Sequence, residues 1–248
     1  MTQESSSGQF IQSIQKGIEY LKEGRFAVLW KAFRNRLYSH TLFFGLRREL
    51  DKPFLPPNAK IDISIRPLQE GDLEQLLENG KFHKKHPKLA AYQESIVRAN
   101  IPTCYVAVTS DGDPCYMQWL IGSRENNRIH NHFGDTFPPL KDNEALLEAA
   151  FMKRTFRGQH IMPAAMARIA EKGKDIGATR ALTFVGCGNI PALKGCRRAG
   201  FTPYIVRRER WVFFRKHVSF SAIPKAMLEQ YEEEVGRVPA PQAAMAGE

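Results

Sequence analysis

Apolar residues recur at helical spacing through the first part of the chain. From Phe10 to Leu37 they fall mostly three or four positions apart, with an interruption at Gly24, which is the period of a helix that buries one face. A short strand, "HTLFFGLRREL", and the proline-rich connector "DKPFLPPNAK" follow. These features predict an N-terminal helical arm over residues 1–60 and a domain boundary near residue 60.

After residue 60 the pattern changes to the alternating and continuous apolar runs that are typical of strands. We predict strands at "KIDISIRPL", "TCYVAVT", "PCYMQWLIG", "ALLEAAFM", "RALTFVG" and "RERWVFFRKHV", the second and third joined as a hairpin by "SDGD". Helical segments broken near Pro87 follow the first strand, and further helices follow the fourth and fifth. This order predicts a mixed α/β domain over residues 61–217, with a C-terminal helix and flexible tail over residues 218–248.

The distribution of charge adds a functional constraint. The net charge is +10 for the chain, +12 over residues 150–217 and −4 over residues 61–149. A basic block beside an acidic one predicts an anionic ligand, with nucleic acid as the competing interpretation. The four cysteines show no CxxC spacing, which disfavours a zinc site or a disulfide framework. The sequence shows no signal-like or membrane-spanning run, so we expect a soluble, cytoplasmic protein.

The run "RTFRGQHIMPAAMARIAEKG", residues 154–173, joins a predicted strand to an amphipathic helix. Backbone N–H groups of such a loop converge with the helix N-terminus on an anion. Pro163 suits the first helical turn, because its missing N–H costs nothing there. The alternative is a structural strand-to-helix turn without a ligand.

Two motifs in this region resemble those of the GNAT superfamily of acyl-CoA-dependent N-acyltransferases. The run "RGQHIM" stands where the family has Arg/Gln-x-x-Gly-x-Gly/Ala, and "NIPALKGCRRAGF" resembles its Asn-x-x-Ala…Gly-Phe segment. The resemblance covers about residues 61–217 and implies a mostly antiparallel central sheet flanked by helices. It also implies acetyl-CoA or another acyl-CoA as cosubstrate, with no metal ion.

The resemblance further implies where the coenzyme would bind. In the family the loop N–H groups bind the pyrophosphate, and the strand before the loop separates from the next strand to admit the pantetheine arm. The positions that correspond to the pyrophosphate loop are Arg157, Gly158, Gln159, His160, Ile161 and Met162. Phe151, Met152 and Lys153 would line the pantetheine, and Asn189 and Ala192 would flank its far end.

His160 and Met162 stand where the family's loop has small residues, chiefly glycine. Every non-proline residue keeps its backbone N–H, so both can still donate, and the substitution is tolerated where the local φ is negative. Met162 begins the predicted helix, and Gly158 remains a permissive position. The His160 ring either donates to a phosphate or turns to solvent.

Acyl transfer to an amine needs a base and often an acid. Glu148 is our candidate base, because a carboxylate in the apolar strand "ALLEAAFM" has a raised pKa if buried. The alternative is that it points out of the sheet and pairs with an arginine, and Glu144 is a second candidate. Cys196 stands where the family commonly has a tyrosine acid, either as a proton donor or, as we expect, as a packed side chain. Tyr204 is a possible substitute acid.

Two pairs of histidines are not assigned a catalytic or metal-binding role. His130 and His132 have a His-x-His spacing but no third ligand, so we expect a loop that contributes to the acceptor pocket. His83 and His86 indicate a solvated, basic helix end.

The function predicted from these observations is an N-acyltransferase, most simply an acetyltransferase, with a small-molecule or peptide amine as acceptor. An acyl-CoA-binding module that has lost catalysis and an aminoacyl transferase that uses charged tRNA are the alternatives. Nucleic acid is disfavoured, because no RNA-stacking motif is apparent. The basic N-terminal arm either packs on the domain or contacts a membrane surface, and a homodimer is left open.

Overall fold

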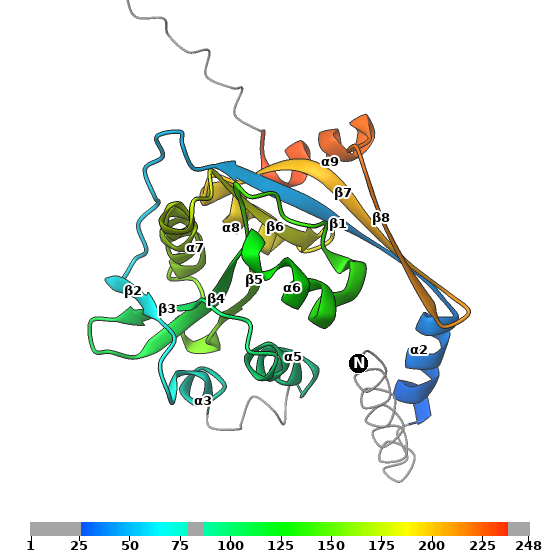
Figure 1. Cartoon of the computed structure of the whole chain (residues 1–248), viewed down its shortest axis with the longest axis horizontal. Coiled ribbons are helices and arrows are strands. Elements are labelled where there is room, and N and C mark those ends of the chain that lie inside the picture. The colour runs from blue at the N-terminus through cyan, green and yellow to red at the C-terminus, as the bar shows by residue number, and fades with distance from the viewer. Residues whose placement is uncertain (1–25, 79–86, 238–248) are drawn as a thin grey trace, which may run out of the picture. The chain divides into compact units, whose positions relative to one another are not determined.

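The computed structural model describes residues 26–78, 87–237 and no others (Figure 1). The first apolar repeats of the arm, His83 and His86, and the tail beyond residue 237 therefore lie outside the described residues. The chain divides into two compact units: unit 1 comprises residues 1–42 and 208–219, and unit 2 comprises residues 43–207 and 220–248.

The described part of unit 1 contains a helix and parts of three strands. These elements are α2 (Phe26–Leu37), the start of β1 (Tyr38–Glu49), the end of β7 (Thr202–Val212) and most of β8 (Arg215–Ser221). Strands β7 and β8 are joined by the two-residue turn Phe213–Phe214, whose N–H groups donate to the carbonyls of Leu37 and Arg36 at 2.9 and 2.8 Å.

Unit 2 contains the remaining strands and helices. The strands are β2 (Ile63–Pro67), β3 (Cys104–Thr109), β4 (Pro114–Gly122), β5 (Glu144–Met152) and β6 (Arg180–Gly186). The helices are α3 (Asp72–Leu76), α5 (Pro87–Arg98), α6 (Asn126–Phe133), α7 (Ile161–Glu171), α8 (Ile190–Arg198) and α9 (Lys225–Val235), with short 3₁₀ turns between some of them.

The strand order is β2-β3-β4-β5-β6-β1-β7-β8. The pairs β2–β3, β3–β4, β4–β5 and β1–β6 are antiparallel, whereas β5–β6 is parallel. The predicted mixed, mostly antiparallel sheet flanked by helices is confirmed. None of the helices in the described ranges is long and apolar enough to cross a bilayer.

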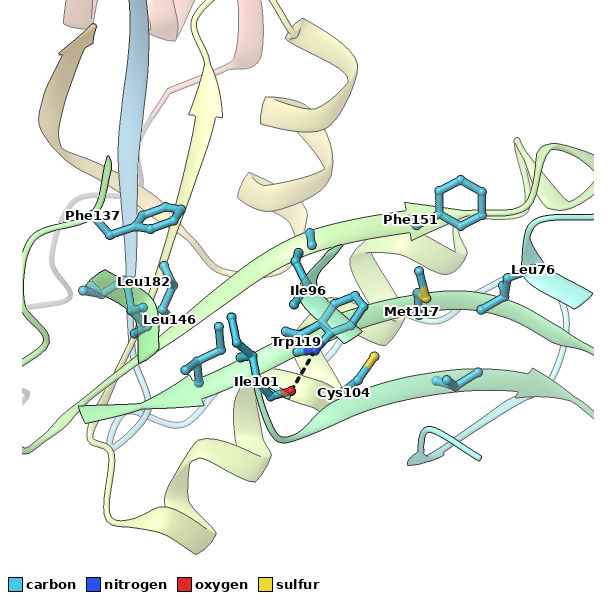
Figure 2. Packing of buried hydrophobic residues seen from close by; sticks show 14 of the residues in the cluster. Leu76, Ile96, Ile101, Cys104, Met117, Trp119, Phe137, Leu146, Phe151 and Leu182 are labelled. Carbon is cyan, nitrogen blue, oxygen red and sulfur yellow. Dashed lines mark hydrogen bonds between the residues drawn. The ribbon is translucent and has the colours of Figure 1, made fainter. Parts of the chain in front are cut away.

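Helices α3, α5 and α6 cover one face of strands β3, β4 and β5. The buried cluster beneath them contains Trp119 and Met117 of β4 together with Leu76, Ile96 and Ile129 of these helices. Figure 2 shows Trp119 within this cluster, where its indole N–H donates to the carbonyl of Ile101 at 3.3 Å. Strand β4 is buried on both faces because α7 packs against it as well, and this explains its continuous apolar run.

Arg48 fixes strand β1 to helix α7. Its side chain is almost fully buried, donates to the carbonyl of Ala167 at 3.1 Å and forms an ion pair with Glu171. The guanidinium also lies 4.1 Å from the centre of the Phe54 ring. Because Ala167 and Glu171 belong to α7, these contacts help to fix the helix that follows the predicted anion-binding loop.

The sheet contains more of the N-terminal region than the sequence suggested. The strand expected at residues 40–50 is confirmed as β1, but we expected it in a separate arm ending near residue 60, whereas it lies between β6 and β7. Residues 43–60 belong to unit 2, because Phe44 and Leu46 are buried in its core. The proline-rich connector is thus a link between two strands of the same unit.

Two further segments differ from the predicted elements. "RERWVFFRKHV" was predicted as one strand, but it contains the end of β7, a turn at Phe213–Phe214 and the start of β8. The turn was missed because it has no glycine, asparagine or proline. The loop expected around His130 and His132 contains helix α6, which buries Ile129 in the core.

Candidate functional site

Strands β5 and β6 are paired over only part of their length. The parallel register joins Glu144 to Arg180, Ala145 to Ala181 and Leu146 to Leu182, and it continues no further, although β5 extends to Met152 and β6 to Gly186. Ala149 has a φ of +54° at the register shift between β5 and β4, which is a bulge that bends the strand. The ends of β5 and β6 nearest the loop are therefore unpaired with each other, as the family resemblance implied.

The loop from β5 to α7 contains two residues with left-handed backbone. Gly158 has a φ of +80° and His160 a φ of +58°. We predicted that a residue with a side chain is tolerated at position 160 if its φ is negative. The positive φ of His160 contradicts this prediction. Histidine adopts this region more readily than most residues with a Cβ, and His160 is the N-cap of α7. Met162 lies inside the helix, as predicted.

Four backbone N–H groups of this loop have no acceptor among the residues that the structure describes. Those of Arg157 and Gln159 donate to the carbonyls of Arg154 and Phe156 at 3.2 and 3.4 Å. No such bond occupies the N–H groups of Gly158, His160, Ile161 and Met162. These donors stand at the N-terminus of α7, where the helix dipole favours negative charge. The geometry is suited to an anion.

Basic side chains lie beside these donors. The N–H of Lys60 donates to the carbonyl of Gln159 at 2.8 Å, and Nη2 of Arg198 lies 3.3 Å from Nδ1 of His160. Partial desolvation, followed by the charges of Arg198 and Lys60, lowers the pKa of the His160 ring. The lowered pKa favours the neutral ring, whose Nδ1 lies within hydrogen-bond distance of Arg198.

The three residues predicted to line a pantetheine arm differ in exposure. Phe151 is buried in the cluster under α3, α5 and α6, whereas Met152 and Lys153 are half-buried. The backbone N–H of Lys153 donates to the carbonyl of Cys115 at 3.0 Å. Phe151 thus contributes to the core, and of these side chains only those of Met152 and Lys153 retain appreciable exposure.

Asn189 and Ala192 lie together at the start of α8. Asn189 is the N-cap of this helix, and its side-chain oxygen accepts from the N–H of Ala192 at 3.4 Å. The cap explains why this spacing of asparagine and alanine begins a helix here. Both residues follow the end of β6 that is not paired with β5, and the resemblance placed them beside the far end of the arm.

Cys196 is packed between α8 and α7. Its Sγ lies 3.7 Å from Sδ of Met166, its side chain is 1% exposed, and burial raises the pKa of the thiol to about 12. Tyr204 is half-buried, and burial followed by Glu144 raises the pKa of its phenol to about 12. The environment of Cys196 is that of a small hydrophobic residue.

Glu148 has a hydrogen-bond partner that the sequence did not indicate. It lies on β5 beside the bulge, and Oη of Tyr92 in α5 donates to its Oε1 at 2.8 Å. Burial raises the pKa of Glu148, while the hydrogen bonds from Tyr92 and the Ala149 backbone and the charge of Arg207 act in the opposite direction. A carboxyl group with a raised pKa in a partly apolar site is suited to accept a proton.

Arg207 adds a positive charge near this carboxyl group. Its guanidinium stacks over the rings of Phe43, Phe137 and Phe184 at 4.0, 5.3 and 5.0 Å, and it donates to the carbonyl of Thr136 at 3.0 Å. The aromatic rings hold the cation in a fixed position.

Two predicted alternatives take other positions. Glu144 lies at the opposite end of β5, where it accepts from the N–H of Lys141 at 3.0 Å. His130 and His132 lie on α6, where the first faces Asp135 at 3.6 Å and the second faces Ser95 at 3.3 Å. No group of three potential metal ligands occurs in the described ranges.

Comparisons with known proteins bear on the fold. No protein-family model and no curated protein matches the chain. Among solved structures, it is similar to the GCN5-related glucosamine N-acetyltransferase region of a fungal multi-domain GH3 β-N-acetylglucosaminidase, with 16% identity and a TM-score of 0.52. That match covers 75% of this chain and 22% of the other.

Two further structures are more distant. One is a GNAT-family acetyltransferase from Colwellia psychrerythraea, with 14% identity and a TM-score of 0.47; the match covers 75% of this chain and 57% of the other. The second is a GCN5-related N-acetyltransferase from Sphaerobacter thermophilus, with 14% identity and a TM-score of 0.42; the match covers 83% of this chain and 69% of the other. This chain thus spans about a fifth of the length of the fungal protein and about half of the length of the Colwellia protein. The similarity to the first structure, at a TM-score of 0.52, supports the GNAT fold that the two motifs predicted; at 16% identity it concerns the fold alone.

Proposed function

We propose that this protein is an N-acyltransferase that moves an acyl group, most simply acetyl, from acyl-CoA to an amine. The observation that carries the proposal is the position of the end of β5 that is not paired with β6, which the short 3₁₀ turn Arg154–Phe156 joins to a loop with four N–H groups that lack an acceptor among the described residues. A thioester arm and a pyrophosphate are joined in coenzyme A in the same order.

The residues of the loop fit an anionic coenzyme. The N–H groups of Gly158, His160, Ile161 and Met162 would bind the pyrophosphate, and the side chains of Lys60 and Arg198 would neutralise its charge. When bound, acyl-CoA supplies an activated thioester carbonyl. The chain's own residues would bind the coenzyme, orient the acceptor and manage the proton.

Glu148 would accept that proton. An amine is protonated near neutral pH, so the ammonium must lose a proton before its nitrogen can attack the thioester carbon. Glu148 takes this proton directly or through a water molecule, an amide bond forms, and the carbon–sulfur bond breaks with its electron pair on sulfur. Tyr92 positions the carboxylate through its 2.8 Å hydrogen bond.

The leaving thiolate does not require a protein acid. A thiol has an ordinary pKa near 8.5, so the thiolate leaves readily and is protonated from solvent. Cys196, with its pKa raised to about 12 in the α7–α8 packing, has no part in this step.

The alternatives make different demands on the same site. A tRNA-dependent aminoacyl transferase would leave the unpaired N–H groups at the start of α7 without a pyrophosphate to bind, so these donors favour acyl-CoA. An acyl-CoA-binding module without catalysis would use the loop but would not need a carboxyl group of raised pKa that is hydrogen-bonded to Tyr92.

The test is an amine screen with acetyl-CoA and longer acyl-CoAs, in which released thiol is detected. With an amine that reacts, Glu148→Gln should lower turnover about 100-fold and leave acyl-CoA affinity almost unchanged, because the defect lies in proton transfer. Glu144→Gln is the matched control on the same strand and should keep turnover within about two-fold. Near-normal turnover of Glu148→Gln would exclude it as the base, and acyl-CoA binding without turnover on any amine would favour the binding module.

A further inference from the structure

Unit 1 exposes a group of aromatic side chains at the end of the β7–β8 hairpin. Trp30, Phe33, Phe213 and Phe214 are 65%, 46%, 75% and 49% exposed, and we call them the aromatic patch. Phe33 packs against both Trp30 and Phe214, with ring centres 5.8 and 5.2 Å apart. Figure 1 shows helix α2 beside the turn that joins β7 and β8. The patch is thus one surface built from two distant segments of the chain.

The turn holds its aromatic residues in an unfavourable backbone conformation. Phe213 and Phe214 have φ values of +44° and +65°, the arrangement of a type I′ turn, for which Asn-Gly is the preferred sequence. Bulky side chains with positive φ are uncommon. Neither ring is buried in the protein, so folding alone does not explain why phenylalanine occupies both positions.

The described part of unit 1, which carries the aromatic patch, has a strong excess of basic residues in its sequence. In residues 26–42 and 208–219, the sequence has seven basic residues and one acidic residue, Glu209. The basic residues are Lys31, Arg34, Arg36, Arg208, Arg210, Arg215 and Lys216. Glu209 pairs with Lys216 at 3.1 Å. Exposed aromatic rings beside an excess of cations complement a surface that is apolar and negatively charged.

We infer that the aromatic patch docks unit 1 on an anionic lipid bilayer. Tryptophan and phenylalanine partition into the interface between headgroups and acyl chains, while lysine and arginine are attracted by the negative surface potential of anionic lipids. The tip of a two-residue turn is the part of a hairpin that can enter such an interface first. The inference does not depend on the proposed acyltransferase activity.

The contacts within the patch argue against other partners. Binding of single-stranded nucleic acid uses aromatic faces on which bases stack, but Trp30 and Phe33 stack on each other with an interplanar angle of 16°, and the guanidinium of Arg36 lies 5.9 Å from the centre of the Trp211 ring. A second copy of the chain would bring the same excess of cations to the interface, and like charges repel.

The experiment is cosedimentation of the full chain with vesicles of phosphatidylcholine, alone or mixed with phosphatidylglycerol. We expect binding to the mixed vesicles, weak binding to phosphatidylcholine alone, and weaker binding at higher salt. Phe213→Asn with Phe214→Gly should weaken binding to mixed vesicles at least about ten-fold, while the melting temperature stays the same or rises because the turn sequence now suits its backbone.

Two variants complete the design. Trp30→Gln removes an aromatic side chain from α2 without touching the turn, and it should also weaken vesicle binding. Leu55→Ser removes a 91% exposed apolar side chain from unit 2 and should leave vesicle binding unchanged.

Four outcomes would overturn the inference. The full chain could fail to bind mixed vesicles, or bind both vesicle types equally. The turn variant could bind mixed vesicles as tightly as the unaltered chain. The unaltered chain could also fail to bind vesicles while the turn variant loses a solution dimer or loses affinity for a single-stranded oligonucleotide. That result would assign the patch to a second copy of the chain or to nucleic acid.

Discussion

At the scale of single residues, the proposed proton acceptor depends on a neighbour that is distant in the sequence. Glu148 lies 56 positions from Tyr92, whose hydroxyl donates to it. An acidic residue within an apolar strand was visible in the sequence and predicted a raised pKa, which the structure confirms in direction. Tyr92 could not be predicted, because nothing in the pattern of α5 indicates which residue faces β5.

The hydrogen bond from Tyr92 should influence the pH dependence of turnover. It acts to lower the pKa of Glu148 against the effect of burial, so Tyr92→Phe should raise that pKa further. Glu148 accepts a proton only when ionised, and activity therefore rises as pH rises through its pKa. The acidic limb of kcat/KM should shift to higher pH in Tyr92→Phe, whereas Tyr204→Phe should leave this limb in place. An unshifted limb in Tyr92→Phe would contradict the assigned pair.

Cys196 offers a second test at this scale. If it is packed between α8 and α7, Cys196→Ala should lose about 1–2 kcal/mol of stability through the small cavity it creates and keep turnover within about two-fold. Thermal unfolding and thiol release measure the two effects, with Cys196→Ser as a variant of similar size. A large loss of turnover in both variants, with melting temperature and acyl-CoA binding intact, would show that the thiol transfers a proton.

At the scale of elements, the sequence predicted most of the strands because their apolar runs are continuous or alternate. It located β1 but assigned it to a separate arm, since no pattern reveals that α7 and Phe54 surround the charged Arg48 inside the buried stretch of this strand. It also missed the β7–β8 turn, because Phe213 and Phe214 are not turn-forming residues. In the loop before α7 it indicated six backbone donors, of which those of Arg157 and Gln159 donate to nearby carbonyls, and it did not indicate the positive φ of His160.

The contacts of Arg48 give a prediction for the stability of the α7 region. Arg48→Met keeps the length of the side chain but removes a buried ion pair and a hydrogen bond to Ala167, which should cost about 3 kcal/mol. Arg47→Met is the matched control, because Arg47 is 41% exposed and pairs with Glu49 at the surface; it should cost less than about 1 kcal/mol. Denaturant unfolding measures both, and equal effects would contradict the role given to Arg48.

At the scale of the whole molecule, the order of elements and two short motifs were sufficient to predict the GNAT fold. The order depends on hydrophobic periodicity, which local sequence carries, and the motifs specify one loop and one helix start. The acceptor is not specified in this way, because the segment around His130 and His132, which we expect to contribute to the acceptor pocket, carries no recognisable motif. The aromatic patch of unit 1 was equally hidden, since it joins α2 to a turn that no local signal predicts.

The most direct test of the account is titration calorimetry of the full chain with acetyl-CoA, together with two variants of Gly158. At a φ of +80°, proline can neither adopt the backbone nor supply the N–H, so Gly158→Pro should weaken binding at least about ten-fold, which is about 1.4 kcal/mol. Gly158→Ala keeps the N–H and its added Cβ meets nothing within 4 Å, but alanine is strained at this φ, so this variant should lose some stability and weaken binding clearly less than Gly158→Pro does. If the unaltered chain does not bind acetyl-CoA, or if a folded Gly158→Pro variant binds it equally well, the coenzyme does not occupy this loop and the proposed function fails.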